Sequence, residues 1–281
     1  MARSRCDGRR WPRPERLAVG HDGDVTTLDD DALRQRRIEA VADEGERVGV
    51  LARQVAAGHP PTTAGLDTRL PWVTDWTVRE LVGHLGTVHR WSTAILRAGH
   101  AMAPGPEARV TPPDTDLLDW YSAGLTELVS TLRTTAPDAP AWHMSPAADK
   151  TAASWARRQA HELVVHRFDL EAAAGVGHAP VAPELAEDGV DELLTVILPR
   201  WVRTEPLISA DASVAVTASD TGRTWSVRAD RGSVTVATDL TGTEDARVQA
   251  PVRDLLLHLW GRPAPVSIDG DPAAEALLRG R

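Results

Sequence analysis

From about residue 31 onward, the apolar positions recur at the three- and four-residue spacing of amphipathic helices. Four such stripes precede residue 175, and the second opens with Thr77 and Glu80, which match a T-x-x-E capping box. In chain order the stripes contain Ile38, Val41, Val48 and Val55; Leu81, Val88, Trp91 and Ile95; Leu118, Tyr121, Leu125, Leu128 and Leu132; and Trp155, Leu163, Leu170 and Ala173. This pattern predicts a four-helix bundle.

The pattern changes near the last third of the chain. A shorter helix is expected around "APELAEDGVDELLTVILPRW", and after Pro206 the segments "ASVAVTA", "TWSVRA" and "SVTVAT" alternate apolar and polar residues. Such alternation between turn sequences predicts an antiparallel sheet. A helix at "VRDLLLHLW", a strand at "APVSIDG" and a helix at "DPAAEALLRG" are expected to follow.

These elements predict an α+β protein of two domains. Residues 1–30 show no sustained periodicity, and we expect a disordered extension there. Residues 31–204 are expected to form the helical bundle. Residues 205–281 are expected to form a small α+β domain with an antiparallel sheet.

Composition excludes several functional classes. The 281 residues carry a net charge of −9, which argues against a general nucleic-acid binder. No apolar run reaches the roughly 18 residues of a membrane span, and no apolar segment of a secretory signal follows the basic first residues. Cys6 is the only cysteine, so disulfides within the chain are excluded and a cysteine nucleophile is not expected. The cytoplasm is the expected location.

Polar residues on the inward helix faces point to a metal site. Glu162 and His166 are four residues apart and therefore share one face of the fourth predicted helix. His84 occupies the apolar stripe of the second helix, whereas His161 and His89 are each turned by about 140° from these faces. Two His and one Glu with an open position are typical of catalytic zinc sites. Asp169, one turn beyond His166, is placed to orient its imidazole.

The same residues allow other interpretations. A single His on a core stripe is commonly a structural residue, and Glu162 with His166 also fits an exposed helical pair. The spacing "HELVVH" has one residue more than the H-E-x-x-H signature, so a zincin-type protease is excluded. Burying Glu and His without partners costs several kcal/mol, which favours a metal.

Three segments together resemble one family. "TDWTVRELVGHLG", "WARRQAHELVVHRFDLEAAAG" and "DLLLHLWGRPAPVSIDGDPAAEALL" are similar to the mycothiol-dependent maleylpyruvate isomerase family, over roughly residues 34–281. The resemblance implies a DinB-like four-helix bundle followed by a small α+β domain. The metal ligands of the family map onto His84, Glu162 and His166. The family segment "PxCPGWTV" reads "LPWVTDWTV" here, without Cys or Gly.

The resemblance also implies a chemistry. It implies a divalent metal, of which Zn²⁺ best suits two His and one Glu, and mycothiol, a thiol of actinobacteria, as cosubstrate. A thiolate would add to the double bond of maleylpyruvate, and rotation about the resulting single bond and elimination would give fumarylpyruvate. In a transferase the adduct would be released instead.

Arg262 in "LWGRP" matches a family motif and is the other candidate catalytic residue, together with Asp169. A guanidinium in an interdomain cleft could hold a substrate carboxylate bidentately. Alternatively, Arg262 caps the carbonyls at a helix end. Arg157 and Arg158 are expected to pair with acids, and the tryptophans are expected mainly in the core.

Two rival functions remain open at this point. One is a metal-dependent hydrolase that uses bound water. The other is a non-catalytic binding protein whose C-terminal domain holds an apolar ligand. The sequence leaves undetermined the physiological substrate, the metal, the oligomeric state and the residues that bind mycothiol; Ni²⁺, Fe²⁺ and Mn²⁺ remain possible.

Overall fold

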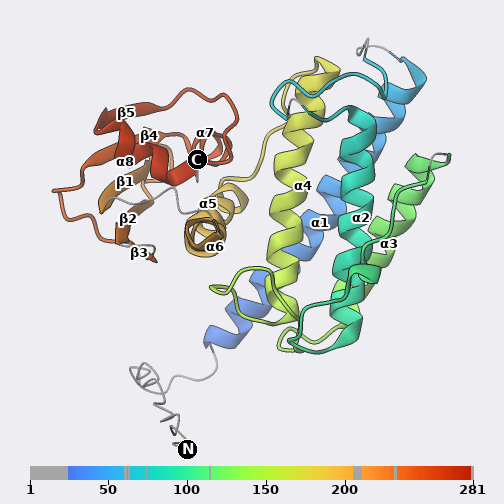
Figure 1. The fold of residues 1–281 in the computed structure, drawn as a ribbon, viewed down its shortest axis with the longest axis horizontal. Helices are drawn as coiled ribbons and strands as arrows, with labels where there is room; N and C mark the ends of the chain where they lie inside the picture. The colour runs from blue at the N-terminus through green and yellow to red at the C-terminus, as the bar shows by residue number, and fades with distance from the viewer. Residues whose placement is uncertain are drawn as a thin grey trace, which may run out of the picture.

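The computed structural model describes residues 25–59, 62, 64–73, 75–113, 115–204, 211–230 and 233–279. The elements follow in the order α1 (Val25–Ala57), α2 (Val78–Ala98), a 3₁₀ turn (Pro106–Ala108), α3 (Leu117–Thr134), α4 (Ala152–Ala174), α5 (Pro183–Glu192), a π-helical segment (Leu193–Ile197), α6 (Leu198–Thr204), β1 (Ala212–Ala218), β2 (Thr224–Asp230), β3 (Ser233–Ala237), β4 (Ala246–Ala250), α7 (Val252–Leu259), β5 (Ser267–Gly270), α8 (Pro272–Ala276) and a last 3₁₀ turn (Leu277–Arg279). Figure 1 shows α1 to α4 side by side as one bundle, with the sheet and its helices beside it. The predicted order of bundle and α+β domain is confirmed.

Apolar stripes hold the bundle together as predicted. Helix α1 packs against α3 and α4, and α2 packs against the same two helices. Most stripe residues are buried in one continuous core, including Ile38, Val48, Leu81, Tyr121 and Leu163. Burial of such side chains contributes roughly 1.5–3 kcal/mol each. The bundle is therefore a stable support for the polar residues that α2 and α4 bring to its interior.

Local signals fix the ends of α2. The Thr77 side chain accepts from the Glu80 N–H while Glu80 accepts from the Thr77 N–H at 2.6 Å, which confirms the predicted capping box. The helix ends at Gly99, whose φ of 62° is the left-handed conformation that favours glycine. These ends place His84 in the second turn of the helix.

The second part of the chain contains a five-stranded sheet in the order β3-β2-β1-β4-β5. Three of its pairings are antiparallel, as predicted, but β1 and β4 run parallel. The sheet is thus mostly antiparallel, and its one parallel pair involves β4, a strand that the sequence pattern did not predict. The alternating burial of β4 shows the physical reason that it forms: Ala246, Val248 and Ala250 face the core.

Helices α5 and α6 pack with the sheet rather than with the bundle core. Val190, Leu194 and Leu198 lie in the second hydrophobic core together with Val216 of β1 and Leu255 of α7. The domain limit expected after residue 204 places these helices in the bundle, whereas their packing places them with the C-terminal domain.

The structure describes only part of the segment that we expect to be an N-terminal extension. Helix α1 begins at Val25, inside the range 1–30 that we expect to be an extension, so this range is too long. Residues 1–24, with Cys6, lie outside the described residues. None of the described helices combines the length and apolar character that a membrane span requires.

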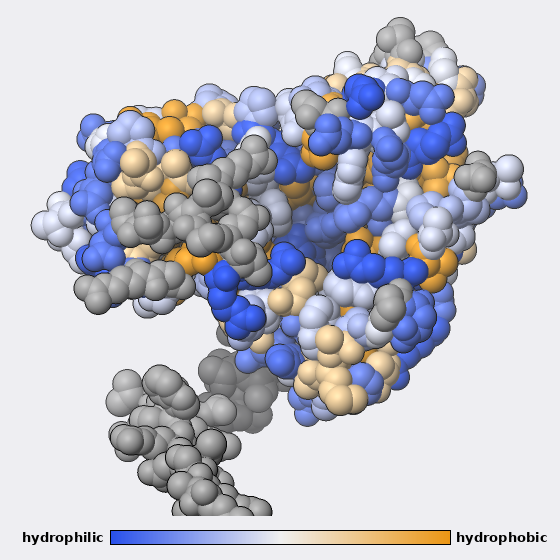
Figure 2. All heavy atoms as spheres, viewed as in Figure 1, coloured by the Kyte–Doolittle hydropathy of each residue, from blue (hydrophilic) through white to orange (hydrophobic). Residues whose placement is uncertain are grey.

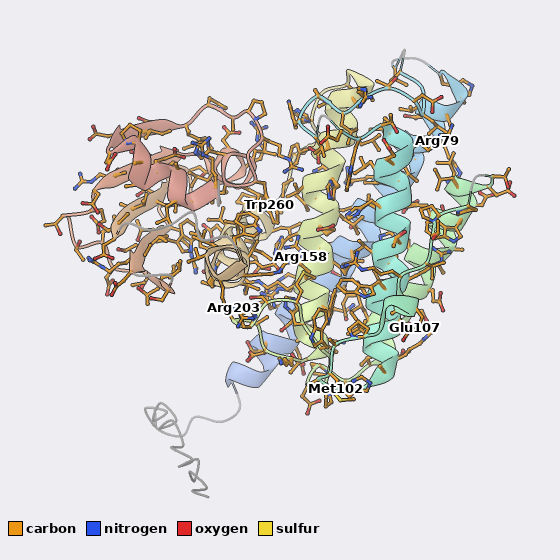
Figure 3. The ribbon with its side chains drawn as sticks, viewed as in Figure 1. Arg79, Met102, Glu107, Arg158, Arg203 and Trp260 are labelled. Carbon is orange, nitrogen blue, oxygen red and sulfur yellow. The ribbon has the colours of Figure 1, made fainter. Side chains whose placement is uncertain are left out.

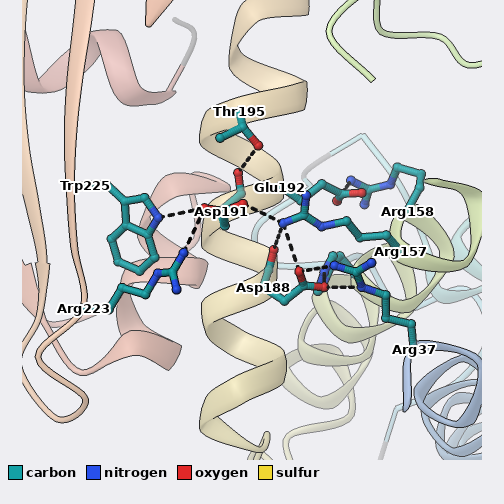
Figure 4. A network of polar contacts seen from close by, with 10 residues as sticks. Arg37, Arg157, Arg158, Asp188, Asp191, Glu192, Thr195, Arg223 and Trp225 are labelled. Carbon is teal, nitrogen blue, oxygen red and sulfur yellow. Dashed lines mark hydrogen bonds and ion pairs between the residues drawn. The ribbon is translucent and has the colours of Figure 1, made fainter. Parts of the chain in front are cut away.

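Acids of α5 tie the two parts together (Figure 4). The Asp188 carboxylate accepts from Arg37 of α1 at 2.6 Å, and its main-chain carbonyl accepts from Arg157 of α4 at 2.9 Å. Asp191 accepts from Arg157 at 2.9 Å and from the indole N–H of Trp225 in β2 at 3.1 Å. This polar network fixes α5 against α4, on which two of the candidate metal ligands lie.

Candidate metal centre

The structure brings three predicted residues to one point inside the bundle. His84 on α2 places Nε2 2.9 Å from Oε1 of Glu162 on α4. One turn further along α4, the Nε2 atom of His166 lies 3.6 Å from the same oxygen. One donor atom from each of the three lies within 4.8 Å of the others. Two imidazoles and a carboxylate therefore converge from facing helices.

Hydrogen bonds and neighbouring charges shift the pKa values of Glu162 and His166. Burial alone would raise the pKa of Glu162, but hydrogen bonds from His166 and His84 and the charges of His166 and Arg158 hold it well below its usual value. Burial lowers the pKa of His166, whereas Asp169 and Glu162 raise it, to about 9 overall. Without a metal, the Glu162 carboxylate is thus balanced by a protonated His166, and a divalent cation bound at this point would take the place of that proton.

Asp169 and Arg262 form the support of His166. The Oδ2 atom of the fully buried Asp169 lies 2.9 Å from Nδ1 of His166. Arg262 donates to both oxygens of Asp169, at 3.0 and 2.6 Å, and to the carbonyl of Trp260 at 2.6 Å. These contacts hold the pKa of Asp169 below its usual value against the effect of burial. A guanidinium of the C-terminal domain thereby orients an imidazole of the bundle.

The contacts of Arg262 differ from those expected of a substrate-binding residue. All three of its nitrogens donate to Asp169 or to the Trp260 carbonyl, which ends helix α7. The bond to the Trp260 carbonyl is the helix-capping contact given above as the alternative role of Arg262. These bonds use three of the five N–H groups of the guanidinium, and a tenth of the side chain is exposed.

Glu162 has a second support in Arg158. The guanidinium donates to the other carboxylate oxygen of Glu162 at 3.2 Å and to the buried Glu192 of α5 at 2.5 Å. Arg157 pairs with Asp188 and Asp191, so both arginines bond to acids, as expected. A fully paired Arg158 keeps the Glu162 side chain in place.

A cleft of about 320 Å³ opens beside the metal-ligand set. Its walls come from both parts of the chain, and Figure 3 shows Arg158 and Trp260 between α4 and the C-terminal domain. On the face drawn in Figure 2 the molecule is hollowed between these parts, with hydrophilic residues in the hollow. The lining consists of His84, Thr87, Val88, Trp91, Arg109, Trp142, Met144, Arg158, Gln159, Glu162, Ile197, Arg200, Trp201 and Trp260. His84 and Glu162 thus face a space where a small molecule fits.

The tryptophans divide between core and site. Trp155 is fully buried in the core, as expected. Trp76 packs on both imidazoles, with ring centroids 4.7 Å from His84 and 6.0 Å from His166. Trp91 is buried in the core, as expected, and also lines the cleft.

The other histidines stay outside the ligand set. His89 is buried against Tyr121, at 5.1 Å between ring centroids, and burial lowers its pKa to about 3. His161 is also buried and contacts Asp188 at 2.8 Å. Helical geometry separated both from the ligand face, and they lie outside the ligand group in the structure.

Several residues were not predicted, namely Trp142, Met144, Arg109 and Arg200 of the cleft, and Glu192, which binds Arg158 behind it. They come from loops or from α5 and α6, where no helical stripe relates them to α2 or α4. A signal was available only for Arg158 and Gln159, which share the face of Glu162.

Comparison with known proteins gives one consistent result. The sequence model of the mycothiol maleylpyruvate isomerase N-terminal domain matches residues 49–171, and that of the corresponding C-terminal domain matches residues 184–276. Crystal structures of the mycothiol-dependent maleylpyruvate isomerase, and of a mutant in which a histidine is replaced by alanine, each align with a TM-score of 0.58. Identity is 13%, over 85% of this chain and 94% of that chain. No curated protein matches the sequence.

Proposed function

This chain belongs to the mycothiol-dependent maleylpyruvate isomerase family, and we propose that it is a metal-dependent enzyme that uses mycothiol to isomerise a maleylpyruvate-like acid. One observation carries the proposal: donor atoms of His84, Glu162 and His166 lie within 4.8 Å of one another beside a cleft. The same site would also serve thiol S-transfer. We propose an actinobacterial cytoplasm as its location, because mycothiol belongs there.

The donor set fits a divalent cation. Two imidazole nitrogens and one carboxylate oxygen leave a position open, as in catalytic zinc sites, so Zn²⁺ is the proposed metal. A divalent cation at this point lowers the pKa of a coordinated thiol or water and so supplies a nucleophile near neutral pH. His84 and Glu162 line the cleft, which gives that nucleophile access to a substrate.

The supporting residues keep the ligands in a binding conformation. The contact of Asp169 with Nδ1 of His166 turns Nε2 toward Glu162, where a bound metal would replace the proton on Nε2. Arg262 holds Asp169, and Arg158 holds the carboxylate of Glu162. We therefore propose that Asp169 and Arg262 are positioning residues.

The test is the thiol dependence of the reaction. Maleylpyruvate is incubated with the metal-loaded protein, with and without mycothiol, and the product is followed by its absorbance. We expect a rate that needs both thiol and protein, that falls at least about 100-fold in His84→Ala, and that persists in the exposed variant His100→Ala.

Two other results would favour a different function. A substrate-consuming rate that is independent of thiol would favour a hydrolase that uses bound water. No turnover, combined with ligand binding that survives His84→Ala, would favour a binding protein. Either result contradicts the proposed isomerase.

A further inference from the structure

A buried acid of α5 lies behind the candidate metal ligands, outside the ligand group itself. Glu192 is 2% exposed and accepts from Arg158 of α4 at 2.5 Å (Figure 4). The other terminal nitrogen of the same guanidinium donates to Glu162 at 3.2 Å. The ring of Trp260 lies over this guanidinium, 5.3 Å from the ring centroid. Arg158 therefore stands between two carboxylates, of which only one belongs to the ligand group.

The helix geometry around Glu192 directs this acid at α4. Directly after Glu192 the chain enters the π-helical segment Leu193–Ile197, where a backbone N–H bonds to the carbonyl five residues earlier. In a regular α-helix two residues five apart are turned by about 140°, whereas a π turn brings them toward one face. Glu192 can thus contact Arg158 while Ile197, five residues later, lines the cleft. Single π turns of this kind are frequent at functional sites.

Glu192 decides the net charge of the side chains that are bonded to the candidate ligands. Asp169 and Arg262 form an ion pair whose net charge is zero. Glu162 and Arg158 form a second pair, so these four side chains together carry no net charge. Glu192 adds one negative charge on the far side of Arg158. That charge attracts a cation and offsets the attraction of Arg158 for the ligand carboxylate.

We propose that Glu192 is a positioning residue of the metal centre, which offsets the charge of Arg158 and so keeps the carboxylate of Glu162 available to the metal. The inference rests on the proposed function, since it concerns the metal on which that function depends. It gives Glu192 a role different from that of Asp188 and Asp191, the acids of α5 that bond to arginines of α1 and α4.

The zinc affinity of the full chain tests the proposal, measured by competition with a chromogenic chelator. Glu192→Gln removes the charge and keeps a hydrogen-bond acceptor, and we expect the affinity to fall about 10- to 100-fold. Glu192→Asp keeps the charge and should lose less. The matched control is Glu275→Gln, because Glu275 is 3% exposed and contacts His258 and Arg279 outside the cleft. This control should retain wild-type affinity.

A double variant separates the proposed role from a contribution to packing alone. In Arg158→Gln/Glu192→Gln both charges are absent, so Glu162 again carries a negative charge that no neighbouring arginine at position 158 opposes. We expect this protein to bind zinc about ten-fold more tightly than Glu192→Gln. Urea unfolding of the metal-free proteins verifies that each variant is folded before its affinity is compared.

The outcomes distinguish this inference from the proposed function. Wild-type affinity in Glu192→Gln, or equal losses in Glu192→Gln and Glu192→Asp, would overturn the inference and leave the metal enzyme intact. A double variant that binds zinc no better than Glu192→Gln would also overturn it, because Glu192 would then act through packing. A folded wild-type protein that binds no zinc would instead refute the proposed function, and the inference with it.

Discussion

His166 shows how one side chain depends on residues far away in the sequence. Its Nε2 faces Glu162 one turn earlier, and its Nδ1 contacts Asp169 less than one turn later. Asp169 is in turn held by Arg262, 93 residues along the chain. The ligand imidazole is therefore oriented by an ion pair that crosses from the bundle to the C-terminal domain.

Asp169→Asn tests this support. An amide cannot balance Arg262 or accept from both His166 and the guanidinium as a carboxylate does, so the imidazole loses its fixed orientation. We expect zinc affinity to fall about 10- to 100-fold, measured by competition with a chromogenic chelator. The exposed variant Asp67→Asn should retain wild-type affinity. Unchanged affinity in Asp169→Asn would show that the contact has no role in metal binding.

Residue spacing predicts only part of the site. Glu162 and His166 are recognisable because they share a helix face, and His84 because it interrupts an apolar stripe. The bond between Arg262 and Asp169 joins two domains, and no periodicity relates them. The sequence therefore suggested a substrate role for Arg262 but gave no sign of its ion pair with Asp169.

At the scale of elements, α2 and α3 approach closely at one glycine. A Cβ atom on Gly86 would lie 2.3 Å from the ring of Trp120, closer than any real contact. The Trp120 ring is itself held by Arg90, whose guanidinium lies 3.9 Å from its centroid. The absence of a side chain at residue 86 thus allows the two helices to pack.

Gly86→Ala is expected to destabilise the bundle. The steric overlap costs roughly 1–3 kcal/mol, which exceeds the gain of up to about 1 kcal/mol from the better helix propensity of alanine. Urea unfolding measures the difference. Gly177→Ala, where a Cβ would meet nothing within 4 Å, should leave the free energy of unfolding within about 0.5 kcal/mol of wild type. A Gly86→Ala protein as stable as wild type would show that Trp120 moves freely.

The long helices could be predicted because their apolar residues recur strongly, whereas one strand was missed because its apolar signal is weak. Strand β4 alternates as a strand should, but two of its three buried residues are alanines, so its apolar signal is small. Its parallel pairing with β1 depends on the path of the intervening chain. The packing of α5 and α6 on the sheet is likewise determined by tertiary contacts. The sequence pattern does not show it, because an amphipathic helix can pack on either hydrophobic core.

For the whole molecule, stability must depend on pH through buried histidines. Burial lowers the pKa of His143 to about 4 and that of His89 to about 3, from 6.5 in each case. Below pH 6.5 the unfolded chain takes up protons that the native protein excludes. The free energy of unfolding therefore falls by up to about 1.4 kcal/mol per pH unit for each histidine as the pH drops toward 4.

His143→Asn isolates one of these contributions. Nδ1 of His143 accepts the N–H of Ser145 at 3.1 Å, and the asparagine oxygen can take over this bond without titrating. Urea unfolding at several pH values between 6.5 and 4 should show a slope that is about 1.4 kcal/mol per unit shallower than in wild type. His100→Asn, at an exposed position, should keep the wild-type slope. Equal slopes for His143→Asn and wild type would contradict a neutral buried His143.

The two parts of the molecule meet where the proposed chemistry takes place. The bundle provides the candidate metal ligands, and the C-terminal domain provides Arg262 and the Trp260 wall of the cleft. Acids on α5 fix this arrangement through Arg37 and Arg157. Neither part alone contains the whole site, so the joining of the domains is itself a condition of the proposed function.

Metal content tests the central claim most directly. Elemental mass spectrometry on protein purified without chelators should find about one divalent ion per chain in wild type and in His100→Ala. The ion should be lost in His84→Ala, Glu162→Gln and His166→Ala, each of which removes one of the converging ligand atoms. A folded wild-type protein that contains no metal and takes up no added Zn²⁺ would contradict the account.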